Sequence, residues 1–67
     1  MKALGKRIKE LRKVQALSQE DLSYEADIPL SQVGRIERGE INPTVSTLDA
    51  IASALHVELK EMFNFKY

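Results

Sequence analysis

The chain contains no cysteine, so disulfides and thiolate metal sites are excluded as sources of stability. Its single histidine, His56, cannot form a zinc site by itself. No apolar run approaches the roughly 18 residues that a membrane span needs, and the first three residues do not lead into an apolar signal segment. We therefore predict a cytoplasmic protein with no bound metal and no cofactor. Its 67 residues suffice for one domain with a small core, which tight helix packing or a partner subunit must stabilise.

Neither sign of charge is in excess over the chain as a whole, because ten Lys and Arg residues balance ten Asp and Glu residues. A net charge of zero is unusual for a nucleic-acid-binding protein. The distribution of the charges is uneven, however, and it matters more than their sum. Residues 1–16 contain six basic residues and one acidic residue, whereas residues 17–40 contain six acidic and two basic residues. The basic first segment is a weak indication of an anionic partner such as DNA.

Apolar residues recur at intervals of three and four along almost the whole chain, which is the period of an amphipathic helix. Leu4, Ile8 and Leu11, for example, share one face of a first helix. No segment shows the alternation of a strand, and no repeat or interior linker divides the chain. The sequence therefore predicts a single all-α, compact five-helix domain. The five helices are expected over residues 3–14, 19–26, 30–38, 43 or 44 to 55, and 58–63.

Local signals set the boundaries of these helices. Ser18 is a preferred N-cap, and Asp21 three residues later nearly completes a capping box. Pro29 suits the first turn of the third helix and prevents the second helix from continuing into it. Gly39 is a natural stop after the third helix. The short connection between the second and third helices has the spacing of a helix-turn-helix, over about residues 18–38.

Five short segments occur in an order and spacing that together are specific, although each is weak alone. They are LGKRI at residues 4–8, LSQEDL at 17–22, IERG at 36–39, NPT at 42–44 and the apolar helix at 48–55. Over about residues 3–63 the chain thus resembles the Cro/phage-repressor type of helix-turn-helix protein, also called the Xre family. The resemblance implies that the third helix lies in the major groove of DNA, while the second lies across the groove and holds it.

Three positions depart from the pattern of that family. Its members often have glycine where this chain has Ala16, Asp27 and His56. These positions lie at helix ends, where a positive φ is common, and Asp and His tolerate that conformation better than Ala does. We expect turns that are built slightly differently and a fold that is unchanged.

The third helix is expected to present a reading face to DNA. Val33 and Ile36 are its inward positions, which leaves an outward set consisting of Leu30, Ser31, Gly34 and Arg35. The resemblance implies that this set contacts base edges. Arg35 is the strongest candidate, because a guanidinium can donate to both O6 and N7 of guanine. The alternative for Arg35 is a solvated surface charge.

A second set is expected to contact the DNA backbone: Gln19, Gln32, Arg38, Asn42, Thr44 and Ser46. Gln19 begins the second helix, whose N-terminal N–H groups favour a phosphate; the alternative is a plain exposed residue. Gln32 could instead reach a neighbouring base. Asn42 could equally cap the fourth helix, and the two roles are compatible.

The resemblance also places Arg12 beside Glu37, as a structural ion pair that links the first helix to the end of the third. The alternative is two separate surface charges. No Ser-His-Asp set, phosphate-binding glycine loop or paired carboxylate site is evident. We therefore predict that the protein is not an enzyme and has no small-molecule ligand.

These patterns predict a transcriptional regulator, either a repressor or an activator, that binds double-stranded DNA in a sequence-specific manner. One recognition helix reads about four or five base pairs, so we expect a homodimer on a palindromic operator. The candidates for the dimer interface are Val57, Met62, Phe63, Phe65 and Tyr67. The alternative function is a protein-interaction module, such as an antitoxin. If the chain is complete, the four residues after the last predicted helix leave little room for a toxin-binding segment.

Overall fold

Helices form from the segments that the apolar periodicity marks. The computed structural model describes residues 2–64 and contains, in order, α1 (Lys2–Val14), α2 (Gln19–Ala26), α3 (Leu30–Glu37), α4 (Val45–Ala54) and the 3-10 helix η1 (Leu59–Phe63). No strand occurs in this described part of the chain. The all-α, five-helix prediction is confirmed, with the last helix wound as a 3-10 rather than an α-helix. None of the helices within residues 2–64 is long and apolar enough to cross a membrane.

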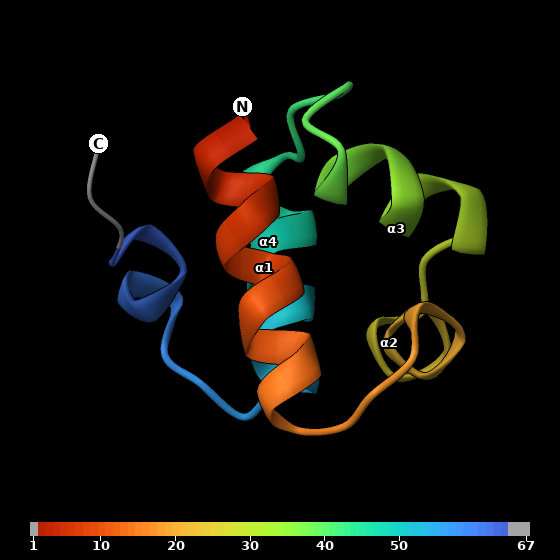
Figure 1. The fold of residues 1–67 in the computed structure, drawn as a ribbon, viewed down its shortest axis with the longest axis horizontal. Helices are drawn as coiled ribbons and strands as arrows, with labels where there is room; N and C mark the ends of the chain where they lie inside the picture. The colour runs from red at the N-terminus through yellow and green to blue at the C-terminus, as the bar shows by residue number, and fades with distance from the viewer. Residues whose placement is uncertain (1, 65–67) are drawn as a thin grey trace.

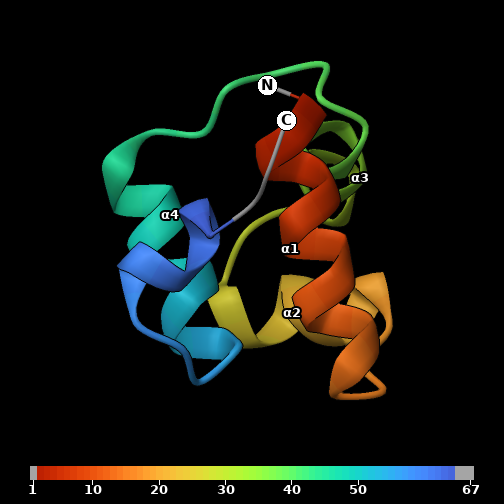
Figure 2. The same ribbon diagram turned by 60° about the vertical axis from the view of Figure 1, so that its left-hand side comes forward.

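The helix-turn-helix unit of α2 and α3 occupies one side of the molecule (Figure 1). The two helices pack against each other, and α2 also contacts α4 while α3 contacts α1. On the other side, η1 contacts both α1 and α4, and Figure 2 shows it lying between them. The loop from α3 to α4 passes over the start of α1 (Figure 2). Helix α1 therefore has α3 on one flank and η1 on the other.

The core lies where the apolar faces of these helices meet, and every helix contributes to it. Its buried members are Leu4, Ile8, Leu22, Ala26, Val33, Ile36, Leu48, Ile51, Ala52, Ala54, Leu55 and Met62. Full burial of a large aliphatic side chain stabilises a fold by about 1.5–3 kcal/mol. A domain of this size therefore depends on each of its few large core residues.

Met62 is the residue of η1 that completes the core, and its side chain is 0% exposed. The prediction that Met62 belongs to a dimer interface is therefore wrong. The reason is tertiary: η1 folds back between α1 and α4, so its inward face closes the core. Phe63, the next residue, points outward and is 46% exposed, while Val57 is partly buried against the core. Phe65 and Tyr67 lie outside the described residues.

The start of α2 is fixed by a reciprocal pair of hydrogen bonds. The Ser18 hydroxyl accepts from the Asp21 backbone N–H at 2.9 Å, and the Asp21 carboxylate accepts from the Ser18 backbone N–H at 2.9 Å. This is the capping box that the sequence predicts. The backbone N–H and the hydroxyl of Ser18 hold the pKa of Asp21 below its usual value.

Four helix ends carry a residue in the left-handed conformation. They are Ala16 (φ 58°), Asp27 (φ 56°), Gly39 (φ 74°) and His56 (φ 58°). At Ala16 this geometry lets the Leu17 N–H donate to the Arg12 carbonyl oxygen at 3.1 Å, so a carbonyl group in the last turn of α1 gains a hydrogen-bond donor. A non-glycine residue in this region costs about 1–2 kcal/mol. The three positions where the family often has glycine thus keep a left-handed backbone, although the residues there are Ala16, Asp27 and His56.

Gly5 lets α1 approach the end of α3 at backbone distance. A Cβ atom at this position would lie 2.3 Å from the Ile36 carbonyl oxygen and 2.7 Å from that of Glu37. Neither oxygen can move away, because both belong to helix backbone. The glycine therefore sets how closely α1 holds the helix-turn-helix unit.

Candidate nucleic-acid interface

Helix α3 has one buried face and one exposed face, and this division fixes what it can present to a ligand. Val33 and Ile36 are each 1% exposed and anchor the helix on the core. Leu30, Ser31 and Arg35 are exposed, as the sequence predicts. Leu30 is 44% exposed, which is a large fraction for an aliphatic side chain next to a core.

Gly34 does not belong to the exposed face, and the prediction that it faces outward is wrong. A Cβ atom on Gly34 would lie 2.9 Å from Nη1 of Arg38 and 3.8 Å from Oε1 of Gln19. Since Gly34 has no side chain, these two long neighbours cover it and leave it buried. A side chain at this position would crowd the Arg38 guanidinium, whereas the Gln19 side chain would lie at an ordinary contact distance.

Arg12 and Glu37 form a bidentate ion pair between α1 and the end of α3. Arg12 Nε lies 2.7 Å from Glu37 Oε2, and Nη2 lies 3.0 Å from Oε1. The two side chains are 9% and 2% exposed, so the pair is buried rather than a pair of surface charges. The third arginine nitrogen, Nη1, donates to the Leu17 carbonyl oxygen at 2.7 Å. The hydrogen bonds that Arg12 donates to the Glu37 carboxylate raise the pKa of Arg12.

The same carboxylate positions the first residue of α2. Gln19 Nε2 donates to Glu37 Oε1 at 3.1 Å, so one oxygen of Glu37 serves both Arg12 and Gln19. Three helices are thereby linked at one point. Gln19 is partly buried and held in place at the N-terminus of α2, where free backbone N–H groups favour an anion.

Glu40 binds the two arginines that were predicted to contact DNA. Arg38 Nε donates to Glu40 Oε2 at 2.5 Å, and Arg35 Nε lies 3.8 Å from Glu40 Oε1. All three side chains are about half exposed. The hydrogen bond from Arg38, with the charges of Arg38, Arg35 and Lys2, holds the pKa of Glu40 below its usual value. The exposed basic end of α3 thus carries its own counter-ion.

Glu40 carries no role that the sequence patterns predict. The signal available in the sequence was an acidic residue that follows Gly39 directly. The left-handed turn at Gly39, with a φ of 74°, reverses the chain and returns Glu40 toward α3. Its backbone N–H donates to the Arg35 carbonyl oxygen at 2.9 Å.

The remaining predicted backbone contacts lie in the loop after α3 and at the start of α4. Asn42, Thr44 and Ser46 are exposed there, and Gln32 on α3 is partly buried. The N-cap of α4 is Thr44, whose hydroxyl accepts from the Thr47 backbone N–H at 3.1 Å. The alternative role of Asn42 as the cap of α4 is therefore wrong, because the helix begins two residues later than that role requires.

The sequence model of the helix-turn-helix family matches residues 8–62. This chain belongs to the helix-turn-helix family. The match includes all of α2, α3 and α4, and most of α1 and η1. The resemblance drawn from the short segments is confirmed.

Named relatives within the helix-turn-helix family are regulators. The chain is 41% identical over 56 residues to the immunity repressor protein of Bacillus phage phi105, covering 84% of this chain and 39% of the repressor. It thus spans about two fifths of that relative's length. The crystal structure of the restriction-modification controller protein C.AhdI from Aeromonas hydrophila has a TM-score of 0.91 at 37% identity, covering 92% of this chain and 94% of the controller.

A second similar structure is the N-terminal DNA-binding domain of SinR from Bacillus subtilis. It has a TM-score of 0.89 at 28% identity and covers 100% of this chain and 99% of its own. SinR, described as the master regulator for biofilm formation, has also been solved in complex with DNA. The helix-turn-helix fold of this chain therefore has a close structural counterpart that binds DNA.

Proposed function

We propose that this protein is a transcriptional regulator that binds double-stranded DNA in a sequence-specific manner, with α3 in the major groove. The proposal rests above all on the exposed face of α3, which carries an arginine and an aliphatic side chain while its opposite face is anchored in the core. Membership of the helix-turn-helix family and the names of the relatives support it. The proposed function is one of binding rather than catalysis, exerted in the cytoplasm.

Base recognition is assigned to three residues of α3. Arg35 would donate to O6 and N7 of a guanine, which is worth about 1–3 kcal/mol of discrimination against other bases. Leu30 offers an apolar surface for a thymine methyl group, and Ser31 offers a hydroxyl that can donate or accept. Gly34, which is buried, takes no part in this set.

Contact with the DNA backbone is assigned to residues around this face. Gln19 holds the start of α2, where backbone N–H groups can bind a phosphate. Arg38 contributes a cation once Glu40 releases it. The polar side chains of Gln32, Asn42, Thr44 and Ser46 complete the set.

The working form is proposed to be a two-fold homodimer on a palindromic operator. Two copies of α3 about 34 Å apart would read successive turns of the major groove on one side of the duplex. Phe63 supports this assembly, because it is 46% exposed and aromatic side chains are enriched in protein–protein interfaces. Val57, which is partly buried on the same segment, is the second candidate of the described residues.

Methylation interference tests the placement of α3. Dimethyl sulfate methylates guanine at N7, in the major groove, and adenine at N3, in the minor groove. On a duplex that the protein selects, N7 methylation at one guanine in each half-site should abolish binding. Adenine N3 methylation within the same half-site should leave binding unchanged. Interference by adenine methylation alone would place the contacts in the minor groove and contradict the proposal.

A further inference from the structure

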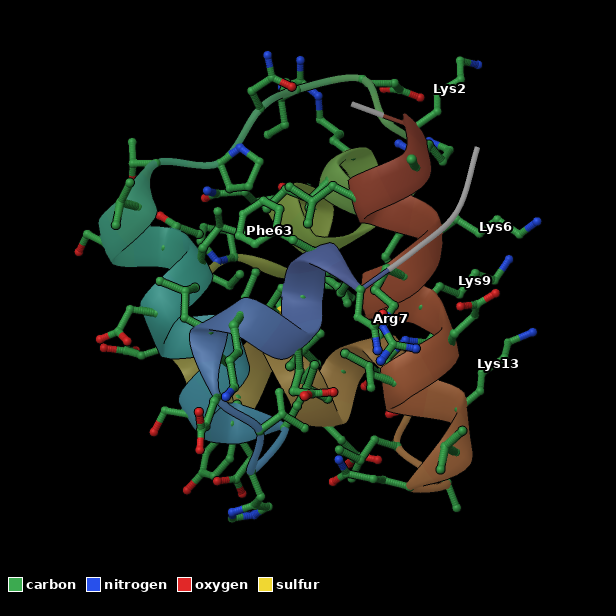
Figure 3. All side chains as sticks on the ribbon, turned by 90° about the vertical axis from the view of Figure 1, so that its left-hand side faces the viewer. Lys2, Lys6, Arg7, Lys9, Lys13 and Phe63 are labelled. Atoms are coloured by element: carbon green, nitrogen blue, oxygen red, sulfur yellow. The ribbon has the colours of Figure 1, made fainter. Side chains whose placement is uncertain are left out.

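Helix α1 carries four lysines on one exposed face. Lys2, Lys6, Lys9 and Lys13 follow one another at intervals of four, three and four residues. Residues at these intervals lie on the same side of a helix. All four are exposed, and Figure 3 shows their side chains one below the other along one edge of α1. We refer to these four residues as the lysine row.

Arg7, also on α1, points in a different direction and has a structural role. Its Nε donates to the Glu61 carbonyl oxygen at 3.0 Å, and Nη2 lies 3.7 Å from the Glu61 carboxylate. Figure 3 shows it directed toward η1, away from the lysine row. The basic residues of α1 are thus divided between two arginines, Arg7 and Arg12, that bind other parts of the fold and a row of lysines that faces solvent.

The acidic residues near the lysine row are engaged by arginines. Glu37 is held by Arg12 at 2.7 Å, and Glu10 faces Arg7 at 3.9 Å. Within residues 2–64, no ion pair includes a member of the lysine row. The row is therefore a line of positive charge that the described part of the chain leaves without a paired carboxylate.

The lysine row borders the proposed DNA-binding surface. Lys6, Lys9 and Lys13 line a surface depression whose other walls are Glu10 and Glu37. Glu37 also holds Gln19, at the start of α2, where we propose that a phosphate binds.

At its other end the lysine row reaches the turn after α3. A Cβ atom on Gly39 would lie 2.7 Å from Cγ of Lys2. The row thus extends from the end of α3 along the flank of the helix-turn-helix unit. A rise of 1.5 Å per residue gives it a length of about 16 Å.

We propose that the lysine row binds phosphates of the DNA that flanks the segment read by α3. This inference rests on the proposed function. A row of about 16 Å spans roughly five base pairs of a duplex at 3.4 Å each, which is enough for several phosphates of one strand. Phe63, which we assign to the dimer interface, lies on a different side of α1 in Figure 3. The row therefore faces DNA outside the two half-sites rather than between them.

The test uses the Lys6→Gln/Lys9→Gln/Lys13→Gln variant and two duplexes. Glutamine keeps the helix propensity and length of the side chain and removes its charge. One duplex ends at the edges of the selected site, and the other extends it by about one turn of random sequence on each side. Lys60→Gln is the control, because Lys60 is an exposed lysine that belongs to η1 rather than to α1. Melting curves establish that each variant is folded.

The wild type should bind the long duplex more tightly than the short one, and the triple variant should lose that advantage. On the long duplex, the log–log salt slope should become shallower by about 0.9 for each phosphate that a lysine no longer neutralises. If three such phosphates are involved, a fourfold rise in salt should weaken DNA binding by the wild type roughly 40-fold more than it weakens binding by the variant. The selected motif should stay the same, and Lys60→Gln should behave as the wild type.

Two outcomes would overturn the inference. If the triple variant keeps the affinity and the salt slope of the wild type, DNA does not reach the row, and an acidic protein would be its better partner. An equal loss on both duplexes would place the lysines over the site itself. Failure of the proposed function is a separate result: the wild type would then bind selected and scrambled duplexes alike.

Discussion

Replacing Arg12 by methionine removes the cation of the buried ion pair and leaves its partner in place. Glu37, with a side chain that is 2% exposed, would lose the bidentate contacts at 2.7 and 3.0 Å and keep the bond from Gln19. The Leu17 carbonyl oxygen would also lose a donor. Removing one partner of a buried pair costs about 3–5 kcal/mol, because a charge stays buried without compensation.

That loss is large for this chain, since 67 folded residues are stable by roughly 3–10 kcal/mol in total. Urea denaturation should therefore show that Arg12→Met is already partly unfolded, or close to unfolding, in buffer without urea. Lys13→Met, an exposed neighbour on α1, is the control and should change the free energy of unfolding by less than about 0.5 kcal/mol.

The double variant Arg12→Met/Glu37→Leu separates the charge from the packing. With both charges gone, no ion remains buried, and most of the lost stability should return. If Arg12→Met costs less than about 1 kcal/mol, the pair behaves like a solvent-screened surface pair and our reasoning about its burial is refuted.

Three further predictions concern other parts of the structure. Ala16→Gly should raise the free energy of unfolding by about 1 kcal/mol, because glycine relieves the left-handed strain at a φ of 58°; urea curves that coincide with the wild type would contradict this. The pKa of Asp21 is lowered in the folded state, so its contribution to stability is present above the unfolded pKa and is lost as pH falls through the folded one. Between pH 6 and pH 2 the melting temperature should accordingly fall less in Asp21→Asn than in the wild type. Equal falls in the two proteins would contradict this role of Asp21. Glu40→Gln frees Arg35 and Arg38 from their counter-ion, so affinity for a scrambled duplex should rise more than affinity for the selected one. An unchanged ratio of the two affinities, measured by fluorescence anisotropy, would show that Glu40 does not limit DNA binding as a counter-ion.

Features governed by nearest neighbours in the sequence were predictable. Ser18 and Asp21 stand three residues apart, and they form the capping box because that geometry needs only one turn of helix. Gly39 ends α3 for an equally local reason. The ion pair of Arg12 with Glu37 spans 25 residues and was expected only from the resemblance to a family.

Features that depend on distant segments were not predictable from the pattern. Gly34 has an outward position on the helical wheel, yet side chains from α2 and from the end of α3 cover it. Met62 and Phe63 are adjacent apolar residues, and only the packing of η1 between α1 and α4 decides which of them is buried. The sequence suggested Asn42 as a cap of the fourth helix, and only the structure shows that Thr44 is the cap instead.

Selection from a random pool of duplex DNA, carried out in parallel with the wild type and Arg35→Ala, tests the proposed function most directly. The wild type should select an inverted repeat with a guanine at the same position of each half-site. Arg35→Ala should keep the repeat and its spacing but lose the preference at that position, with about 1–3 kcal/mol weaker binding to the original site. Selection of no motif by the wild type, or of the same motif with the same guanine by both proteins, would contradict a recognition helix that reads bases through Arg35.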